Sequence, residues 1–263
     1  MAIKLCFMSP IAHLGEFSER GDMLLALPHI VQNSTIYEKY YRDTQKKIIL
    51  DSGVIEVGKP EKFEILIKIG ENIEASVIAL PDYLHDASKT IESAKIIYEN
   101  FHNYIRLKRF SFMGIIQGKN VKEWLKCFEK MANMDMITIL GIGIYSVKHV
   151  FQSITHKTDC LNNRLACIEL LDKKNMIPKG KKIHLLGLGE PRELLYQKEY
   201  PFINSCDTTR PIMYGINGRR YTKEGYIIGG EYEGSKMDYF MKIPKCNYSD
   251  IMFNIDVVKR LAQ

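Results

Sequence analysis

Seven short apolar runs recur along the chain, and each one ends in a glycine, a proline or an aspartate. They occupy residues 3–10, 46–53, 76–82, 111–118, 136–143, 182–189 and 201–207. Their apolar residues are continuous rather than alternating, which is typical of strands buried on both faces. The runs therefore predict the strands of a parallel sheet.

Segments with a helical spacing of apolar residues lie between these runs, for example residues 86–105 and 120–134. The first has Asp86 as a candidate cap and predicts an apolar face made by Ile91, Ala94, Ile97 and Tyr98. A strand followed by a helix, repeated about every 30 residues, indicates βα units. The best interpretation is an α/β fold with one (β/α)8 TIM barrel domain over residues 1–263, and a doubly wound open sheet is second.

The eighth strand of such a barrel is not evident from the sequence. After Asp207 the chain becomes rich in glycine and tyrosine, which predicts a loop or hairpin insertion near residues 212–245. A last helix over residues 249–263 begins with the cap-like Ser249 and Asp250 and is expected to close the barrel.

Composition and charge limit the function classes. The chain has 263 residues, 46% of them hydrophobic, and no apolar segment as long as a bilayer span. Its six cysteines are scattered without a C-x-x-C pair, so we expect reduced thiols, no zinc site and no zinc subdomain. The first residues suit a strand better than a signal peptide. These features favour a soluble cytoplasmic protein without a membrane partner.

The net charge of +6 permits contact with a polyanion without requiring it. Much of that charge lies in the runs "IRLKRF", "PKGKKIH" and "NGRRYTK". Each run is compatible with a solvated face, the commoner case, or with a groove for phosphates.

In a βα barrel the active site lies where the strands end. The ends of the seven runs supply polar or glycine residues, namely Asp51, Asp82, Gln117, Gly143, Gly187 with Gly189, and Asp207. Each has a structural alternative, such as an Asx-turn, a helix cap or a tight turn. Three carboxylates and an amide at strand ends nevertheless favour a shared polar pocket. Two carboxylates can flank a glycosidic carbon, and a carboxylate with an amide matches the edge of a guanine-like base.

The strand ends carry an ordered series of short motifs. In chain order they read "ILDSGVIE", "LPDYLHD", "MGIIQG", "ILGIGI", "HLLGLGEPREL" and "NSCDTTRPIMYG". This series resembles the motifs of the tRNA-guanine transglycosylase superfamily and covers about residues 48 to 220. The resemblance implies a TIM barrel and a base-exchange reaction.

The resemblance also implies roles for individual residues. Asp207 corresponds to the nucleophile that attacks C1′ of a guanosine nucleotide, and Asp51 to the general acid and base. Asp82 would read N1 and the exocyclic amine of the base, while Gln117 and a backbone amide near Gly143 would hold O6. The same motifs contribute Ser52, Gly118 and Gly187 to the base site and Arg210 to nucleic-acid contacts. Arg219 and Arg220 follow the last motif in the glycine-rich segment, where they could meet phosphates or equally take part in hairpin packing.

Two family features are missing from this sequence. There is no zinc-binding C-x-C-x-x-C motif, and no space for an RNA-binding domain after residue 220. A better match is the shorter branch of DNA 7-deazaguanine transglycosylases, which phages and bacterial DNA-modification islands encode. The stretch from "SPIAHL" to "ILDSGVIEVG" resembles that branch and adds Ser9, His13 and Glu56 as site residues. His13 is also compatible with a satisfied loop histidine.

The leading expectation is therefore an enzyme that replaces guanine in DNA with a 7-deazaguanine such as the 7-cyano form, without a cofactor. The alternatives are a reduced tRNA-guanine transglycosylase and a non-catalytic subunit that binds nucleic acid or a partner. A target base must leave its duplex to be reached. Tyr214, Tyr221 and Tyr226 could then stack on nucleotides, or simply pack within a hairpin.

Overall fold

The computed structural model describes residues 2–107, 110–228 and 236–263. In these residues eight strands form one sheet in the order β1-β8-β7-β6-β5-β4-β3-β2. The strands are β1 (Lys4–Phe7), β2 (Leu24–Ala26), β3 (Ile48–Leu50), β4 (Val77–Ala79), β5 (Ser111–Ile115), β6 (Ile137–Gly143), β7 (Lys182–Leu186) and β8 (Ile203–Thr208). Sequential neighbours lie side by side and β1 pairs with β8, which is the order of a (β/α)8 barrel. The predicted α/β TIM-barrel fold is confirmed.

Helices alternate with the strands along the chain. They are α1 (Pro28–Asn33), α2 (Thr35–Asp43), α3 (Val54–Val57), α4 (Phe63–Asn72), α5 (Ala87–Leu107), α6 (Val121–Ala132), α7 (Ile144–Thr155), α8 (Cys160–Lys173), α9 (Glu193–Gln197), α10 (Arg210–Ile216) and α11 (Tyr248–Ala262). Short 3-10 turns occur at η1 (Ile11–His13), η2 (Ser18–Arg20) and η3 (Lys245–Asn247). Among the described helices none is long and apolar enough to cross a membrane.

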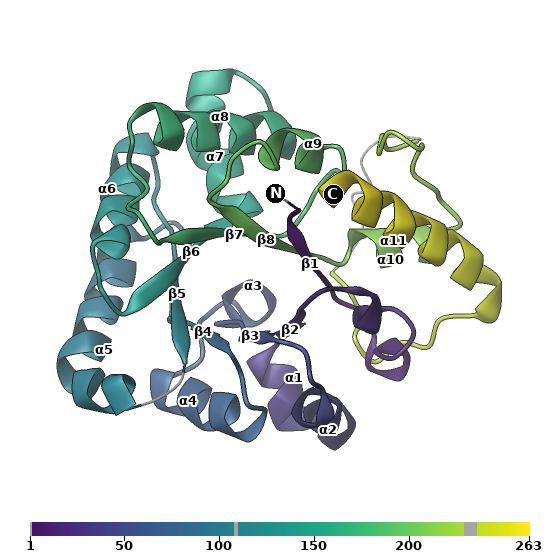
Figure 1. Cartoon of the computed structure of the whole chain (residues 1–263), viewed down its shortest axis with the longest axis horizontal. Helices are drawn as coiled ribbons and strands as arrows, with labels where there is room; N and C mark the ends of the chain where they lie inside the picture. Colours follow the sequence, from purple (N-terminus) through teal and green to yellow (C-terminus); the bar gives the residue numbers. More distant parts are fainter. Residues whose placement is uncertain (1, 108–109, 229–235) are drawn as a thin grey trace. The chain divides into compact units, whose positions relative to one another are not determined.

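The chain divides into two compact units, one of residues Leu25–His184 and the other of Met1–Leu24 with Leu185–Gln263. In the first unit β3, β4, β5 and β6 pair in parallel, with a register shift between Phe112 and Met113. Helices α4, α5 and α6 cover the outside of these strands (Figure 1). The strand residues are buried on both faces, as their continuous apolarity predicted.

The two helices predicted in this unit are confirmed. Helix α5 starts after Asp86, whose Oδ1 accepts the Lys89 N–H at 2.9 Å, so the predicted cap is present. Helix α6 starts after Asn120, whose Oδ1 accepts the Glu123 N–H at 3.0 Å. Tyr98 is an exception, because its side chain is 46% exposed and lies outside the buried face of Ile91, Ala94 and Ile97.

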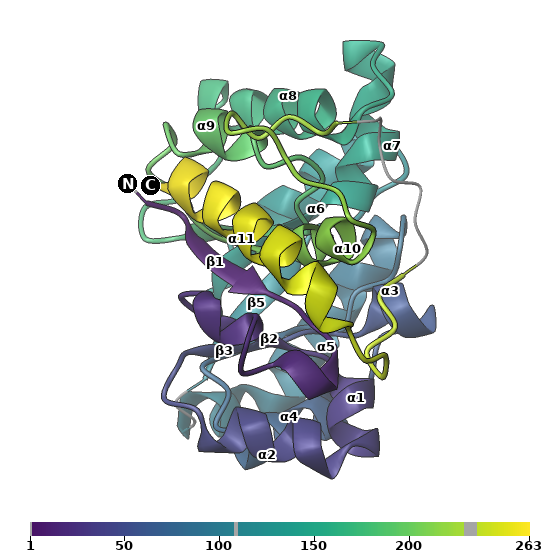
Figure 2. The same ribbon diagram turned by 90° about the vertical axis from the view of Figure 1, so that its right-hand side faces the viewer.

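The second unit is built on the parallel pair of β1 and β8, in which Cys6 lies opposite Asp207. Helix α11 runs along β1 (Figure 2), and the Ile3 N–H donates to the Ala262 carbonyl at 2.9 Å. The predicted cap of this helix is wrong. Ser249 and Asp250 instead bind Arg220, and the helix begins after Asn247 without a side-chain cap.

The strand that was not evident from the sequence is β2, and it lies near the start of the chain rather than after Asp207. Asp207 therefore belongs to the eighth strand, not to a seventh. Strand β2 has three residues and is followed almost at once by Pro28, the first residue of α1, so it is too short to show a run of its own.

The predicted insertion near residues 212–245 is partly helical, because α10 extends to Ile216. Beyond it, Tyr221 and Ile227 form an isolated antiparallel bridge, which agrees with a hairpin. Residues 229–235 of the expected insertion lie outside the described residues.

We expect Gly118→Ala to destabilise the protein by about 1–3 kcal/mol, as overpacking does. A Cβ at Gly118 would lie 2.5 Å from the backbone nitrogen of Trp124, whereas one at Gly143 would approach nothing closer than 3.9 Å. Gly143→Ala is therefore the matched control, and it should lower the free energy of unfolding by less than about 1 kcal/mol. Urea unfolding of both variants measures the difference, and equal stabilities would contradict the prediction.

Candidate active site

Three of the predicted site residues are joined by hydrogen bonds, two of them donating to the buried carboxylate of the third. Ser52, Asp82 and Gln117 follow the ends of β3, β4 and β5, and each is at most 3% exposed. The Ser52 hydroxyl donates to Asp82 Oδ1, and Gln117 Nε2 donates to Asp82 Oδ2, both at 2.7 Å. We call these three residues the Asp82 cluster.

The amide of Gln117 is held at both ends. Its Oε1 accepts the backbone N–H of His85 at 3.2 Å, while its nitrogen binds Asp82. His85 has a φ of 59°, in the left-handed region that residues other than glycine rarely adopt. Sequence reasoning missed His85 because a backbone contact of this kind has no signal in the side-chain pattern.

Burial gives Asp82 an unusual proton affinity. Loss of water around the carboxyl raises its pKa from 3.8 to about 7, although the Ser52 hydrogen bond acts to lower it. The nearby Asp51 carboxylate raises the pKa further, and the Gln117 hydrogen bond lowers it. Near neutral pH this carboxyl can therefore accept or release a proton.

Asp51 lies at the end of β3, next to the Asp82 cluster in the chain, and is 8% exposed. Its Oδ2 accepts the N–H of Gly53 at 3.1 Å, which is the bond of an Asx-turn. Gly53 has a φ of 78° and starts the short helix α3, which carries Glu56. The turn fixes the direction of the Asp51 side chain and is compatible with a chemical role for it.

Asp207 belongs to the other unit of the chain and has its own partners. It is 8% exposed, and its Oδ1 accepts the N–H of Gly187 at 3.0 Å. Gly187 has a φ of 73°, so a glycine is favoured where this amide turns toward the carboxylate. Thr208 holds the following turn, because its hydroxyl oxygen accepts the Arg210 N–H at 3.0 Å.

A buried thiol lies beside Asp207 in the sheet. Burial raises the pKa of Cys6 well above its usual value, and the charges of Asp207 and Asp22 raise it further. The thiol therefore stays protonated, and the group opposite Asp207 in the sheet is neutral.

His13 and Ser9 have structural partners. His13 Nε2 accepts the Ile243 N–H at 2.8 Å, and its Nδ1 lies 2.8 Å from the Tyr248 hydroxyl. A ring with Nε2 as acceptor is neutral and donates from Nδ1. Ser9 binds the Ser18 hydroxyl at 2.9 Å. These contacts agree with the alternative of a satisfied loop histidine.

The basic and aromatic residues after Asp207 differ from one another. Tyr214 and Tyr221 are at most 2% exposed, with ring centroids 5.1 Å apart, so they pack within the unit and are wrong as stacking residues. Tyr226 is 50% exposed, and the Arg192 guanidinium lies 4.7 Å from its ring centroid.

The predicted nucleic-acid arginines have contacts within the protein or lie at a helix start. Arg220 Nε binds Asp250 at 2.6 Å. The Arg219 carbonyl accepts from Asn254, and Arg210 begins α10.

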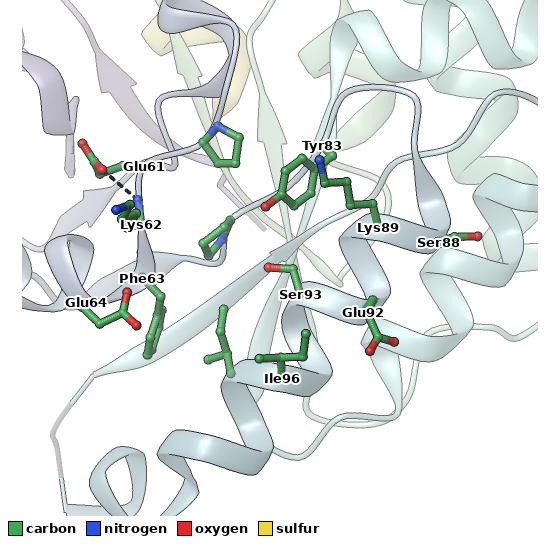
Figure 3. A pocket seen from close by; sticks show the side chains of 13 residues that line it. Glu61, Lys62, Phe63, Glu64, Tyr83, Ser88, Lys89, Glu92, Ser93 and Ile96 are labelled. Carbon is green, nitrogen blue, oxygen red and sulfur yellow. Dashed lines mark hydrogen bonds between the residues drawn. The ribbon is translucent and has the colours of Figure 1, made fainter.

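An apolar groove of about 710 Å³ lies on the first unit (Figure 3). Pro81 and Tyr83 contribute to it from either side of Asp82, and Lys89 reaches over the Tyr83 ring at 4.1 Å from its centroid. None of the predicted site residues lines this groove. In the part of the chain that the structure describes, no three histidine, cysteine, aspartate or glutamate side chains are grouped to hold a metal ion.

We expect a ¹³C NMR titration of the Asp82 carboxyl to give a pKa near 7. The Ser52→Ala variant should raise it, because the lost hydrogen bond favours the charged form. Between about pH 4 and pH 7 the folded chain keeps a proton that the unfolded chain releases. The contribution of Asp82 to the free energy of unfolding therefore falls as pH rises, by at most about 1.4 kcal/mol per unit. A pKa near 4 would contradict this.

Neither the models of protein families nor the curated proteins include a match to this chain.

Proposed function

We propose that this protein is a guanine transglycosylase that replaces guanine in DNA with a 7-deazaguanine such as 7-cyano-7-deazaguanine. The observation that carries the proposal is the buried Asp82 carboxylate with its two hydrogen-bond donors, Ser52 and Gln117. Guanine presents two donors, N1–H and the 2-amino group, beside the O6 acceptor. The remaining lone pairs of Asp82 match those donors, and the second amide hydrogen of Gln117 matches O6.

In the proposed reaction the Asp207 carboxylate attacks C1′ of the target nucleotide. The C1′–N9 bond breaks, its electron pair goes to guanine, and the Asp51 carboxyl donates a proton to the departing base. The sugar is then an ester of Asp207. N9 of the incoming 7-deazaguanine attacks C1′ and releases the Asp207 carboxylate, while Asp51 takes up the N9 proton.

The surroundings of Asp207 support its role as the nucleophile. The Gly187 N–H fixes the orientation of the carboxylate before substrate arrives. The neighbouring Cys6 is protonated and inert, as described above. The net charge of +6 permits a polyanionic substrate, and Arg210, which follows Asp207 in the chain, is the proposed contact for a phosphate near the target sugar.

The test is base exchange in nucleic acid. Purified protein is incubated with 7-cyano-7-deazaguanine and with single-stranded DNA, duplex DNA or tRNA, and the nucleosides are then analysed by mass spectrometry after digestion. We expect the modified nucleoside in DNA. Asp207→Asn should lower its yield at least about 10³-fold, because no ester can form. Asp172→Asn, which changes an exposed carboxylate on α8, is the control and should leave the yield unchanged.

A second readout separates the enzyme from a binding protein. Without an acceptor base, the wild-type protein should form a covalent adduct with DNA that survives denaturing electrophoresis, and Asp207→Asn should not. Exchange into tRNA alone would support the tRNA enzyme instead. No modified nucleoside in any of the three substrates would refute the proposal.

A further inference from the structure

We propose that His85 is a positioning residue, whose backbone N–H fixes which end of the Gln117 amide faces the bound base. It thereby selects a purine with a carbonyl at position 6 over one with an amino group there. This inference rests on the proposed base-exchange function, because that function is what makes a purine base the ligand of Gln117. Its structural basis is the pair of hydrogen bonds that His85 and Asp82 make to opposite ends of one amide.

The two bonds permit only one orientation of the amide. His85 N–H is a donor and needs the amide oxygen, whereas the Asp82 carboxylate is an acceptor and needs the amide nitrogen. Turning the amide over would set N–H against N–H at His85 and oxygen against oxygen at Asp82. The Asp82 end of the amide is buried and the His85 end is partly buried, so water replaces at most part of the two lost bonds.

The loop that carries His85 is held without help from Gln117. The Asp86 N–H donates to the Tyr83 carbonyl at 3.0 Å, which closes a turn around His85. The Thr90 hydroxyl oxygen accepts the Tyr83 N–H at 3.0 Å. The His85 ring also packs edge to face against His149 of α7, with ring centroids 5.4 Å apart. The position of the His85 N–H is therefore set before Gln117 binds to it.

This arrangement determines what Gln117 offers to a ligand. Its oxygen is occupied by His85, and one amide hydrogen is occupied by Asp82. The second hydrogen on Nε2 has no acceptor among the described residues. A purine carbonyl can accept it, but a 6-amino group would place two donors against each other. The discrimination is thus made by a residue whose side chain need not touch the base.

Two substitutions at position 85 separate the backbone contact from the side chain. Proline has no N–H and fixes φ near −65°, so His85→Pro removes the hydrogen bond. Glycine keeps the N–H and adopts positive φ, so His85→Gly preserves it. Equilibrium binding of guanine and of 2,6-diaminopurine is measured for both variants and the wild type. We expect the wild type and His85→Gly to prefer guanine, and His85→Pro to lose at least about tenfold of that preference.

An unchanged preference in His85→Pro would overturn the inference while leaving the proposed function intact. Because this variant could fail to fold, a second measurement uses Gln117→Ala and needs no ligand. Removing the acceptor should speed amide hydrogen exchange at His85 at least about tenfold. The amide of Thr90, which donates to the Asp86 carbonyl, is the internal control and should not change.

The two measurements also distinguish failure of the inference from failure of the proposed function. If neither purine binds the wild type, base recognition fails, and faster exchange at His85 in Gln117→Ala still supports the positioning contact. Unchanged exchange at His85 would overturn that contact whatever the protein binds.

Discussion

A carboxylate without water is costly unless donors surround it, and Asp82 is such a group. Its two hydrogen bonds join the ends of three adjacent strands, β3, β4 and β5, through their side chains. Loss of either donor would leave a buried acceptor unpaired, which costs more than the bond itself contributes. The same bonds that stabilise this edge of the sheet therefore also hold the proposed base-binding groups in place. Stability and the proposed base recognition thus depend on one set of contacts.

Much of the fold and of the Asp82 cluster could be predicted from the sequence, for a local reason. A strand buried on both faces is apolar throughout, and the first polar residue after it marks its end. Asp82 and Gln117 are predicted in that way, whereas Ser52 was implied only by the resemblance of its motif, and the structure joins all three. The same rule failed for β2, because three residues between a loop and a helix leave no run long enough to recognise. Because one strand was missed, the sequence assigned Asp207 to the seventh strand, whereas it lies in the eighth.

The remaining features depend on contacts between residues far apart in the chain. Arg220 pairs with Asp250 thirty positions later, and His13 accepts from Ile243 after 230 positions. Before these partners are known, an arginine near a glycine-rich turn is equally compatible with a phosphate contact. Tyr214 and Tyr221 illustrate the same limit, because their burial depends on how α10 and the following bridge pack. The residue type alone allows either a ligand contact or an internal contact, and the packing of distant segments determines which one forms.

The protonated thiol of Cys6 next to Asp207 has a consequence for chemical labelling. Electrophilic reagents react with thiolates, so Cys6 should resist them, while Cys246 is exposed and open to attack. An electrophilic sugar analogue captured at Asp207 would be joined through oxygen, as an ester that hydroxylamine cleaves. One captured at Cys246 would be a thioether that survives the same treatment. The lability of the label thus reports whether a carboxylate or a thiol carries it, without mass spectrometry of the peptides.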